Sequence, residues 1–407
     1  MRGAIVVACG IGIAACGGTG TPVDEGSWQA EREVIGNTTV VRTLLGSVWS
    51  TPREAGVDLS IGSAEGPEET MFGYVNQIAP DAGGGVYVYD YQVPAIRYFD
   101  ADGQFIRKVG REGQGPGEYL DAVLGTAVRS DGRLQIWDAR NGRVTIYKPD
   151  GSYSEQWPVS SSLFTSQAMF VDQSDHTYIK KTLERPVEGQ PWKIGLLHFD
   201  DQGNLLETIP DPSVPDAPRS DGGFLSPSKQ WTLARDTSFI VGMNSSYWFE
   251  IRKPDGQVVR VERDVQPLAV TDAEHAAYEE RREYLIRDQG QFMTQLPAET
   301  ERVKPAYRDL SADPSGRIWV RLHGPVEPDP DYQPAPEGEA PRWPFTEDKL
   351  YDVFEPDGTY LGQVHVPSDV NVLHFGLDAL WGIREGELGH QYVVRMRLQP
   401  TSAGGDR

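Results

Sequence analysis

Short apolar runs that alternate with polar residues recur along the body of the chain, and each run lies next to a turn sequence. Alternation with a period of two predicts half-buried β-strands rather than helices. The clearest copies are Val86–Tyr89, Leu134–Trp137, Phe239–Gly242 and Ile318–Arg321, and weaker copies are Thr177–Lys180 and Leu380–Ile383. The chain is therefore expected to consist mainly of short strands.

One turn sequence returns about every fifty residues, with apolar residues on both sides of a glycine that follows Asp or Gln. Glycine adopts the positive φ that a tight hairpin needs, so each copy predicts a β-hairpin. The five copies are Phe99–Phe105, Tyr147–Tyr153, Phe199–Leu205, Ile251–Val258 and Phe354–Tyr360.

A second turn runs in phase with the first, and its six copies lie at 83–86, 131–134, 174–177, 235–238, 314–317 and 376–379. The two turns together predict six units of four antiparallel strands. Such units hide their faces against each other when they are arranged radially. The sequence therefore predicts an all-β fold, a six-bladed β-propeller over residues 35–400, with a disordered tail at 401–407.

The sixth unit stops at its third strand, His390–Met396, just before the C-terminus. Its fourth strand has to come from elsewhere in the chain. The segment Thr38–Leu45 has the pattern of a strand. We expect this N-terminal strand to complete the sixth sheet, so that the two ends of the chain join and close the ring. The alternative is that the strand is only a local cap.

Two insertions interrupt the fifth unit. Thr271–Glu274 is a capping-box pattern, and the charge-rich stretch that follows to about Leu296 predicts one helix or two short ones. The segment 325–344 is rich in proline and acidic residues, which predicts an extended loop. Long inserted loops usually lie over one face of a repeat body and carry its function.

The first fifteen residues have the pattern of a signal peptide, with a positive charge before the apolar stretch Ala4–Ala15. The stretch leads into Ile13–Cys16 (IAAC), which resembles the bacterial lipobox. The resemblance implies cleavage before Cys16 and acylation of that residue, and Gly17 in place of Asp favours the outer membrane. We expect a lipid-anchored protein of the bacterial cell envelope, with a tether over 16–34. The alternative is an ordinary secretory signal with an incidental cysteine.

The net charge of −22, from 38 Lys+Arg and 60 Asp+Glu, makes nucleic acid an unfavourable partner because the chain repels phosphate backbones. Both cysteines, Cys9 and Cys16, lie in the first sixteen residues. A mature chain that starts at Cys16 would hold no disulfide, so packing and hydrogen bonding must stabilise it. We expect a monomer.

The second predicted blade resembles the six-bladed propellers of the NHL-repeat type. It contains Gly110–Tyr119 (GREGQGPGEY), Asp131–Asp138 (DGRLQIWD) and Asn141–Tyr147 (NGRVTIY). The glycine-rich segment lacks the ending of a phosphate-binding loop, so we interpret it as a crossover between blades. The resemblance implies a propeller fold. It does not select a function, because such propellers include protein-binding and sugar-binding members, lyases and lactonases.

Two arginines are candidates for ligand binding. Asp90 and Asp138 end the second strands of their blades, and Arg97 and Arg143 begin the third. These pairs either tie their loops together by hydrogen bonds or form a polar ring that binds an anionic or sugar ligand at the mouth of the channel.

His323 and His374 are the histidines expected to approach each other near that mouth, although no HxH or HxxxH pair with metal-ligand spacing occurs. The resemblance implies zinc in propeller lyases and calcium in lactonases, but no cofactor is expected here. Trp343, in an irregular proline-flanked loop, is a candidate for stacking on a sugar or peptide.

Two functions follow from these candidates, beside a purely structural role in the envelope. The first is an envelope-anchored binding or scaffold propeller that recognises a protein or glycan through one face. The alternative is a metal-dependent lyase or lactonase with its site in the central channel.

Overall fold

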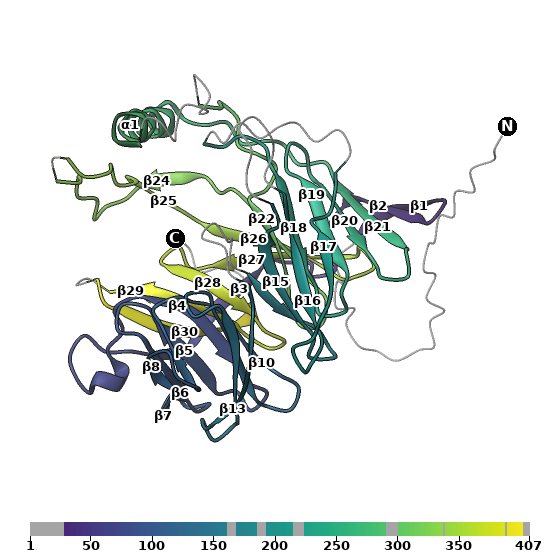
Figure 1. The fold of residues 1–407 in the computed structure, drawn as a ribbon. Helices are drawn as coiled ribbons and strands as arrows, with labels where there is room; N and C mark the ends of the chain where they lie inside the picture. Colours follow the sequence, from purple (N-terminus) through teal and green to yellow (C-terminus); the bar gives the residue numbers. More distant parts are fainter. Residues whose placement is uncertain are drawn as a thin grey trace, which may run out of the picture.

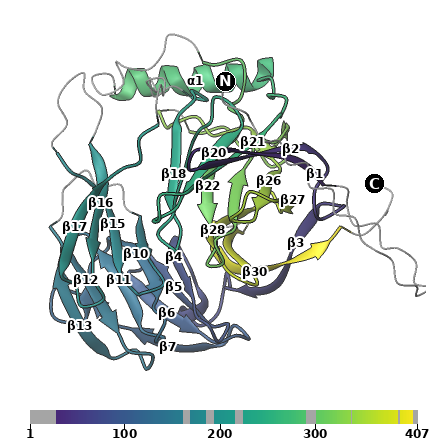
Figure 2. The same cartoon turned by 90° about the vertical axis from the view of Figure 1, so that its right-hand side faces the viewer.

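Six blades of four antiparallel strands each make up the body of the protein (Figures 1 and 2). Two of the blades are joined into one eight-stranded sheet, and a third is extended to six strands. The computed structural model describes residues 28–160, 168–184, 193–214, 224–289, 300–336, 338–386 and 389–401. The first strands of all six sheets line one central cavity of about 400 Å³. This radial order confirms the predicted six-bladed β-propeller.

In each of the first three blades, the four strands follow one another along the chain. Blade one contains β4 (Val75–Pro80), β5 (Val86–Asp90), β6 (Ala95–Phe99) and β7 (Phe105–Val109). Blade two contains β10 (Val123–Val128), β11 (Leu134–Asp138), β12 (Arg143–Tyr147) and β13 (Tyr153–Pro158). Blade three contains β14 (Met169–Val171), β15 (Thr177–Thr182), β16 (Ile194–Phe199) and β17 (Leu205–Pro210).

The last three blades are interrupted or completed by other segments. Blade four contains β18 (Lys229–Leu233), β19 (Phe239–Met243), β20 (Trp248–Arg252) and β21 (Val258–Arg263). Blade five contains β22 (Asp309–Ala312), β23 (Ile318–Arg321), β26 (Lys349–Phe354) and β27 (Tyr360–Val366). Blade six contains β28 (Val370–Phe375), β29 (Leu380–Glu385), β30 (Gln391–Pro400) and β3 (Arg53–Ile61).

Both repeated turns form where the sequence predicts them. In the hairpin between β6 and β7, for example, the amide of Asp100 donates to the carbonyl of Gln104, and Gly103 adopts a φ of 78°. The equivalent glycines of the other four hairpins, at 151, 203, 256 and 358, have φ between 83° and 84°. These positions lie in the left-handed region, where glycine is the residue without a steric penalty.

Apolar side chains hold neighbouring blades together. The described residues form six hydrophobic clusters, and each cluster lies between one pair of adjacent blades. The cluster between blades six and one joins Ile61 and Trp381 to Phe99, which seals the ring where the two ends of the chain meet. Each fully buried side chain of this size contributes roughly 1.5–3 kcal/mol.

The closing strand is β3, so the prediction that Thr38–Leu45 completes the sixth blade is wrong. Strand β3 pairs antiparallel with β30 in a register that includes Glu54 with Gln399 and Ile61 with Val393. The carboxylate of Asp58 accepts hydrogen bonds from Arg395 and Arg397 across the same pair of strands. Burial opposes ionisation of Asp58, but these arginines outweigh it and lower its pKa below the ordinary value.

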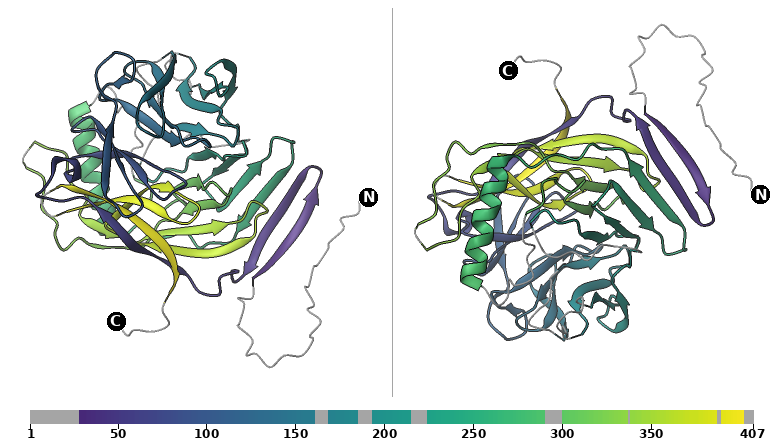
Figure 3. Two further views of the ribbon diagram at one scale, coloured as in Figure 1. Left: turned by 90° about the horizontal axis from the view of Figure 1, so that it is seen from below. Right: turned by 90° about the horizontal axis from the view of Figure 1, so that it is seen from above.

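The segment Thr38–Leu45 (β2) extends a different sheet. It forms a hairpin with β1 (Gln29–Ile35) and pairs parallel with β21 at the outer edge of blade four. Figure 3 shows this hairpin projecting beside that blade. The strand is held there because Val41 is fully buried in the cluster between blades four and five. Strand β1 also begins inside the segment 16–34 that was expected to be a tether.

The two predicted insertions lie on one side of the body (Figure 1). Only the proline-rich one interrupts blade five, because the helical one lies in the connection from blade four to blade five. The helix α1 spans Asp272–Gln289, and residues 290–299 lie outside the described part of the chain. The proline-rich segment is closed at its base, because β24 (Val326–Pro328) at its start pairs with β25 (Phe345–Glu347) directly after it.

Smaller elements complete the described chain. The glycine-rich crossover contains the short parallel pair β8 (Arg111–Glu112) and β9 (Glu118–Tyr119), and a single 3-10 turn covers Glu68–Thr70. Of the described segments, none forms a helix with the length and apolar character needed to cross a membrane. The expected signal peptide, Cys16, and residues 402–407 of the expected tail lie outside the described residues.

Candidate functional site

A cleft of about 650 Å³ lies between the two insertions and the adjoining ends of blade-five strands. We call it the insertion cleft. Twelve of its fifteen lining side chains are aromatic, cationic or acidic. They are Phe224, Tyr278, Trp343 and Phe345; Arg281, Arg308, Arg321 and Lys349; and Asp329, Asp331, Glu347 and Asp369.

The aromatic side chains form one wall of the insertion cleft. The ring of Trp343 lies 4.5 Å from the ring centre of Tyr278 and 5.3 Å from that of Phe345. Tyr278 belongs to α1 and Phe345 to β25, so both insertions contribute. The structure therefore places Trp343, which the sequence singled out, in a half-buried aromatic cluster beside polar groups.

The helix that carries Tyr278 is fixed to blade five by a buried ion pair. Glu274 and Thr271 form the predicted capping box, in which each side chain accepts a hydrogen bond from the other's backbone amide. The other oxygen of Glu274 lies 2.7 Å from Nζ of Lys304, and both side chains are almost fully buried. Lys304 also donates to the carbonyl of Gly324. This wall is consequently positioned before any ligand arrives.

Positive charges gather at the base of the cleft, although the chain as a whole is strongly acidic. Burial and the nearby Arg321 lower the pKa of Lys349 to about 8. Lys349 donates to the carbonyl of Val370, and Arg321 lies 3.9 Å from Asp309. Burial raises the pKa of Asp309 above its ordinary value, and Arg321 and Arg308 oppose that shift.

Two of the acidic groups are already paired. Glu347 forms an ion pair with Arg308 and accepts a hydrogen bond from the amide of Gly324. Asp369 lies 2.6 Å from Nε of Arg384. Arg308 is thus held by Glu347, whereas Arg321 and Lys349 remain at the base of the cleft for an anionic group of a ligand.

His323 lies behind this base rather than in the cleft. Its side chain is 7% exposed, and its Nδ1 is 4.0 Å from Glu347. Burial and the positive charges of Arg308, Lys304 and Arg321 lower its pKa to about 3, so the imidazole is neutral at physiological pH. It supports the cleft by packing.

His374 lies at the opposite end of the channel, so the expected meeting of His323 and His374 is wrong. It lines a cavity of about 620 Å³ together with Arg235, Pro314 and Gly376, at the face that carries the turns between first and second strands. His323 follows the other end of β23, and the length of the strands separates the two. Burial, with a smaller effect of Arg235, lowers the pKa of His374 to about 4.

The two candidate arginines stabilise loops. Arg97 is fully buried, lies 3.4 Å from Asp90, and has its guanidinium over the ring of Phe72. Arg143 donates to the backbone carbonyls of Gln114, Gly115 and Glu118, and so fixes the glycine-rich crossover. The lining of the insertion cleft includes neither of them.

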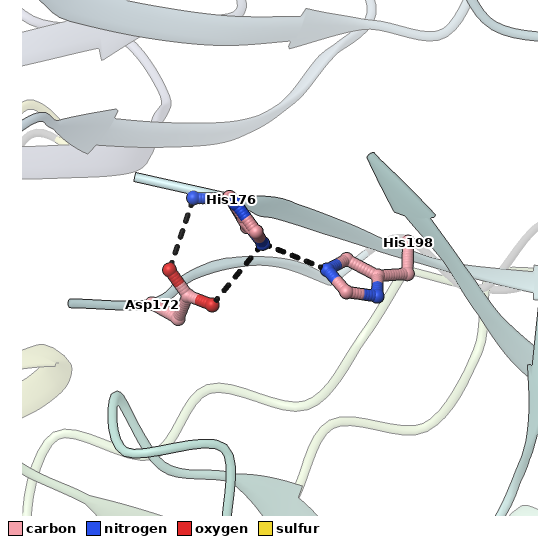
Figure 4. A group of neighbouring side chains, drawn as sticks. All are labelled: Asp172, His176 and His198. Carbon is pink, nitrogen blue, oxygen red and sulfur yellow. Dashed lines mark hydrogen bonds and ion pairs between the residues drawn. The ribbon is translucent and has the colours of Figure 1, made fainter. Parts of the chain in front are cut away.

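A second polar cluster was not predicted from the sequence. Asp172, His176 and His198 of blade three each direct a donor atom toward the others, and these atoms all lie within 4.8 Å of one another (Figure 4). The two histidines are 22 residues apart, so a search for closely spaced histidines misses them. The signal lies in the strand register. Tyr178, two residues after His176, pairs with His198, and this pairing brings the two histidines close together. The central channel is lined by other residues.

A family model, DUF5128, described as a six-bladed beta-propeller, matches residues 64–211. No curated protein matches the chain. Among solved structures, a member of the DUF4221 family from Bacteroides vulgatus is similar at 12% identity, with a TM-score of 0.51 over 86% of this chain and 99% of that chain.

Two enzymes also align over most of their length. A gluconolactonase from Xanthomonas campestris is 10% identical, with a TM-score of 0.39 over 84% of this chain and 99% of that chain. Virginiamycin B lyase from Staphylococcus aureus is 9% identical, with a TM-score of 0.37 over 86% and 95%. Together, the radial sheets and the family match define a six-bladed β-propeller. Its resemblance to the NHL-repeat type stays a prediction.

Proposed function

We propose that this protein is a cell-envelope binding propeller that recognises a saccharide bearing an anionic group in the insertion cleft. The observation that carries the proposal is the convergence of Trp343 and Tyr278 with Arg321 and Lys349 in one cleft. Aromatic rings supply an apolar face for stacking on a sugar ring. The two cations supply charge-assisted hydrogen bonds to a carboxylate or similar group.

Titration calorimetry with a uronic-acid trimer and the matched neutral trimer tests the proposal. We expect the uronic-acid trimer to bind more tightly. Trp343→Ala should weaken both ligands by about 10-fold or more, because it removes the stacking surface. Lys349→Met should weaken only the charged trimer, by about 10-fold, since it removes one charge-assisted hydrogen bond.

The pKa of Lys349 also predicts how the affinity for the charged trimer depends on pH. Its lowered pKa of about 8 means that it loses its positive charge as the pH rises from 7 to 9. Affinity for the charged trimer should therefore fall over this interval, while affinity for the neutral trimer should not. The matched control is Arg317→Ala, which removes a half-buried arginine paired with Glu355 in the turn before β23, away from the cleft. Binding by neither trimer, or equal binding to the wild type and Trp343→Ala, would contradict the proposal.

The location of the protein is a separate part of the proposal, supported by the lipobox-like IAAC sequence that ends at Cys16. Acyl chains on this residue would hold the protein on a membrane. We expect Cys16→Ser to move the protein from the membrane fraction to the soluble fraction of the cell and to abolish labelling with radioactive palmitate. Unchanged fractionation and labelling would disprove the anchor without affecting the cleft.

A further inference from the structure

Blade three holds three side chains of metal-ligating type. They lie near the face of the propeller that carries the turns between the first and second strands of the blades. Nδ1 of His176 lies 3.0 Å from Nε2 of His198 and 3.8 Å from Oδ2 of Asp172 (Figure 4). Donor atoms at about 2.0–2.1 Å from a tetrahedral zinc ion lie roughly 3.3 Å apart. The observed spacing is thus close to that of a coordination sphere.

The carboxylate of Asp172 is oriented by its own turn. Its Oδ1 accepts hydrogen bonds from the amides of Ser174 and His176, at 2.8 and 3.0 Å. Its Oδ2, which faces the histidines, accepts one from the hydroxyl of Tyr178 at 3.0 Å. The oxygen that would bind a metal is therefore fixed in direction and keeps a free lone pair.

The ring of His198 is oriented in the same way. Its Nε2 faces His176, while its Nδ1 lies 3.2 Å from Oε1 of Glu207. The ring also stacks on Tyr178, with centroids 4.2 Å apart. A carboxylate behind a histidine fixes the tautomer that leaves the opposite nitrogen free for a metal, and this arrangement is common in zinc sites.

Neighbouring blades hold the turn from both sides. The carboxylate of Asp175 accepts hydrogen bonds from the amide and hydroxyl of Ser130 in blade two. The amide of Gln173 donates to the carbonyl of Arg235 in blade four. Asp172 and His176 therefore lie in a turn whose position is set by the neighbouring blades, and His198 lies beside them in β16.

From this geometry we infer that Asp172, His176 and His198 form a site for a divalent transition-metal ion, with zinc as the ion best suited. Two imidazoles and one carboxylate match the preference of zinc, whereas calcium prefers six to eight oxygen ligands. The side chain of His176 is 30% exposed, so the site is accessible to solvent. Three protein ligands leave the fourth position of a tetrahedral ion for water or an external ligand.

Zinc titration of the chelator-treated full chain tests the site. We expect one zinc ion per chain by calorimetry and by elemental analysis of the dialysed protein. His176→Ala and His198→Ala should each weaken binding by about 100-fold or more, because each removes a ligand. Glu207→Gln should weaken it by roughly 10-fold, since that residue acts only through His198. His365→Ala is the matched control, because this histidine also lies near a carboxylate, Glu54, but away from the cluster.

Cobalt(II) gives a readout that does not depend on affinity. The wild type should show the intense visible absorption of four-coordinate cobalt, and His176→Ala should lose it while keeping the far-ultraviolet circular dichroism of the folded protein. Absence of zinc uptake would leave only a hydrogen bond between the two histidines, and uptake that survives both histidine substitutions would place the ion elsewhere. Either result overturns the inference. The inference is independent of the insertion cleft and of its ligand.

Discussion

At the scale of single residues, the hairpin glycines connect local conformation to packing between blades. Gly203 and Gly256 have the same φ of 83°, so both need the conformational freedom of glycine. They differ in their surroundings: a Cβ at Gly203 would lie 2.3 Å from the ring of Trp157, and one at Gly256 would meet nothing within 4 Å. Trp157 belongs to blade two, so the turn of blade three rests directly on its neighbour.

Alanine substitutions at these two glycines distinguish the free-energy cost of backbone strain from the cost of disturbed packing between blades. Gly256→Ala should cost about 1–2 kcal/mol of unfolding free energy, from the left-handed conformation alone. Gly203→Ala should cost about 1–3 kcal/mol more, because Trp157 has to move out of a packed cluster. Urea unfolding of both variants measures the difference. Equal losses would mean that the blade-three turn does not pack on Trp157 as described.

At the scale of elements, the sequence predicted those strands, turns and helix ends that local patterns determine. The hairpin glycines and the alternating strands gave six units, and Thr271 and Glu274 marked the start of α1. The closing strand was missed because β3 contains the charged residues Arg53, Glu54 and Asp58 and has a weaker apolar pattern than β2. Which strand closes the ring depends on pairing with β30, more than 300 residues away, and no local pattern encodes that choice.

The candidate sites divide in the same way, into residues that a local sequence pattern reveals and residues that only the fold brings together. Trp343 was predicted because an aromatic residue between prolines is unusual in an irregular loop, and it does line the insertion cleft. Arg321 and Lys349 were missed because each is an ordinary charged residue in its own strand, and only the packing of blade five brings them together. The Asp172–His176–His198 cluster was missed for the same reason, since strand register rather than sequence spacing unites it.

At the scale of the whole molecule, the apolar packing between neighbouring blades differs around the ring. Among the described residues, the cluster between blades four and five has 14 buried members, whereas the cluster between blades three and four has only Tyr178, Leu196 and Leu233. A Cβ at Gly256, in the hairpin of blade four, would meet no atom within 4 Å, whereas one at Gly203 in the hairpin of blade three would meet Trp157. The junction where the ends of the chain meet is better packed, because β3 contributes Ile61 there and pairs along its length with β30.

Closure of the ring by β3 is the central structural claim, and disulfide trapping measures it directly. Glu54 and Gln399 are exposed, directly opposed residues of β3 and β30. Opposed residues of antiparallel strands have Cα atoms about 4.5–5.5 Å apart, within the range of a disulfide. With Cys9 and Cys16 replaced by serine, Glu54→Cys together with Gln399→Cys should form a crosslink in the folded protein and not in urea. Arg42→Cys together with Gln399→Cys should form none. A crosslink through residue 42, and none through residue 54, would contradict this closure.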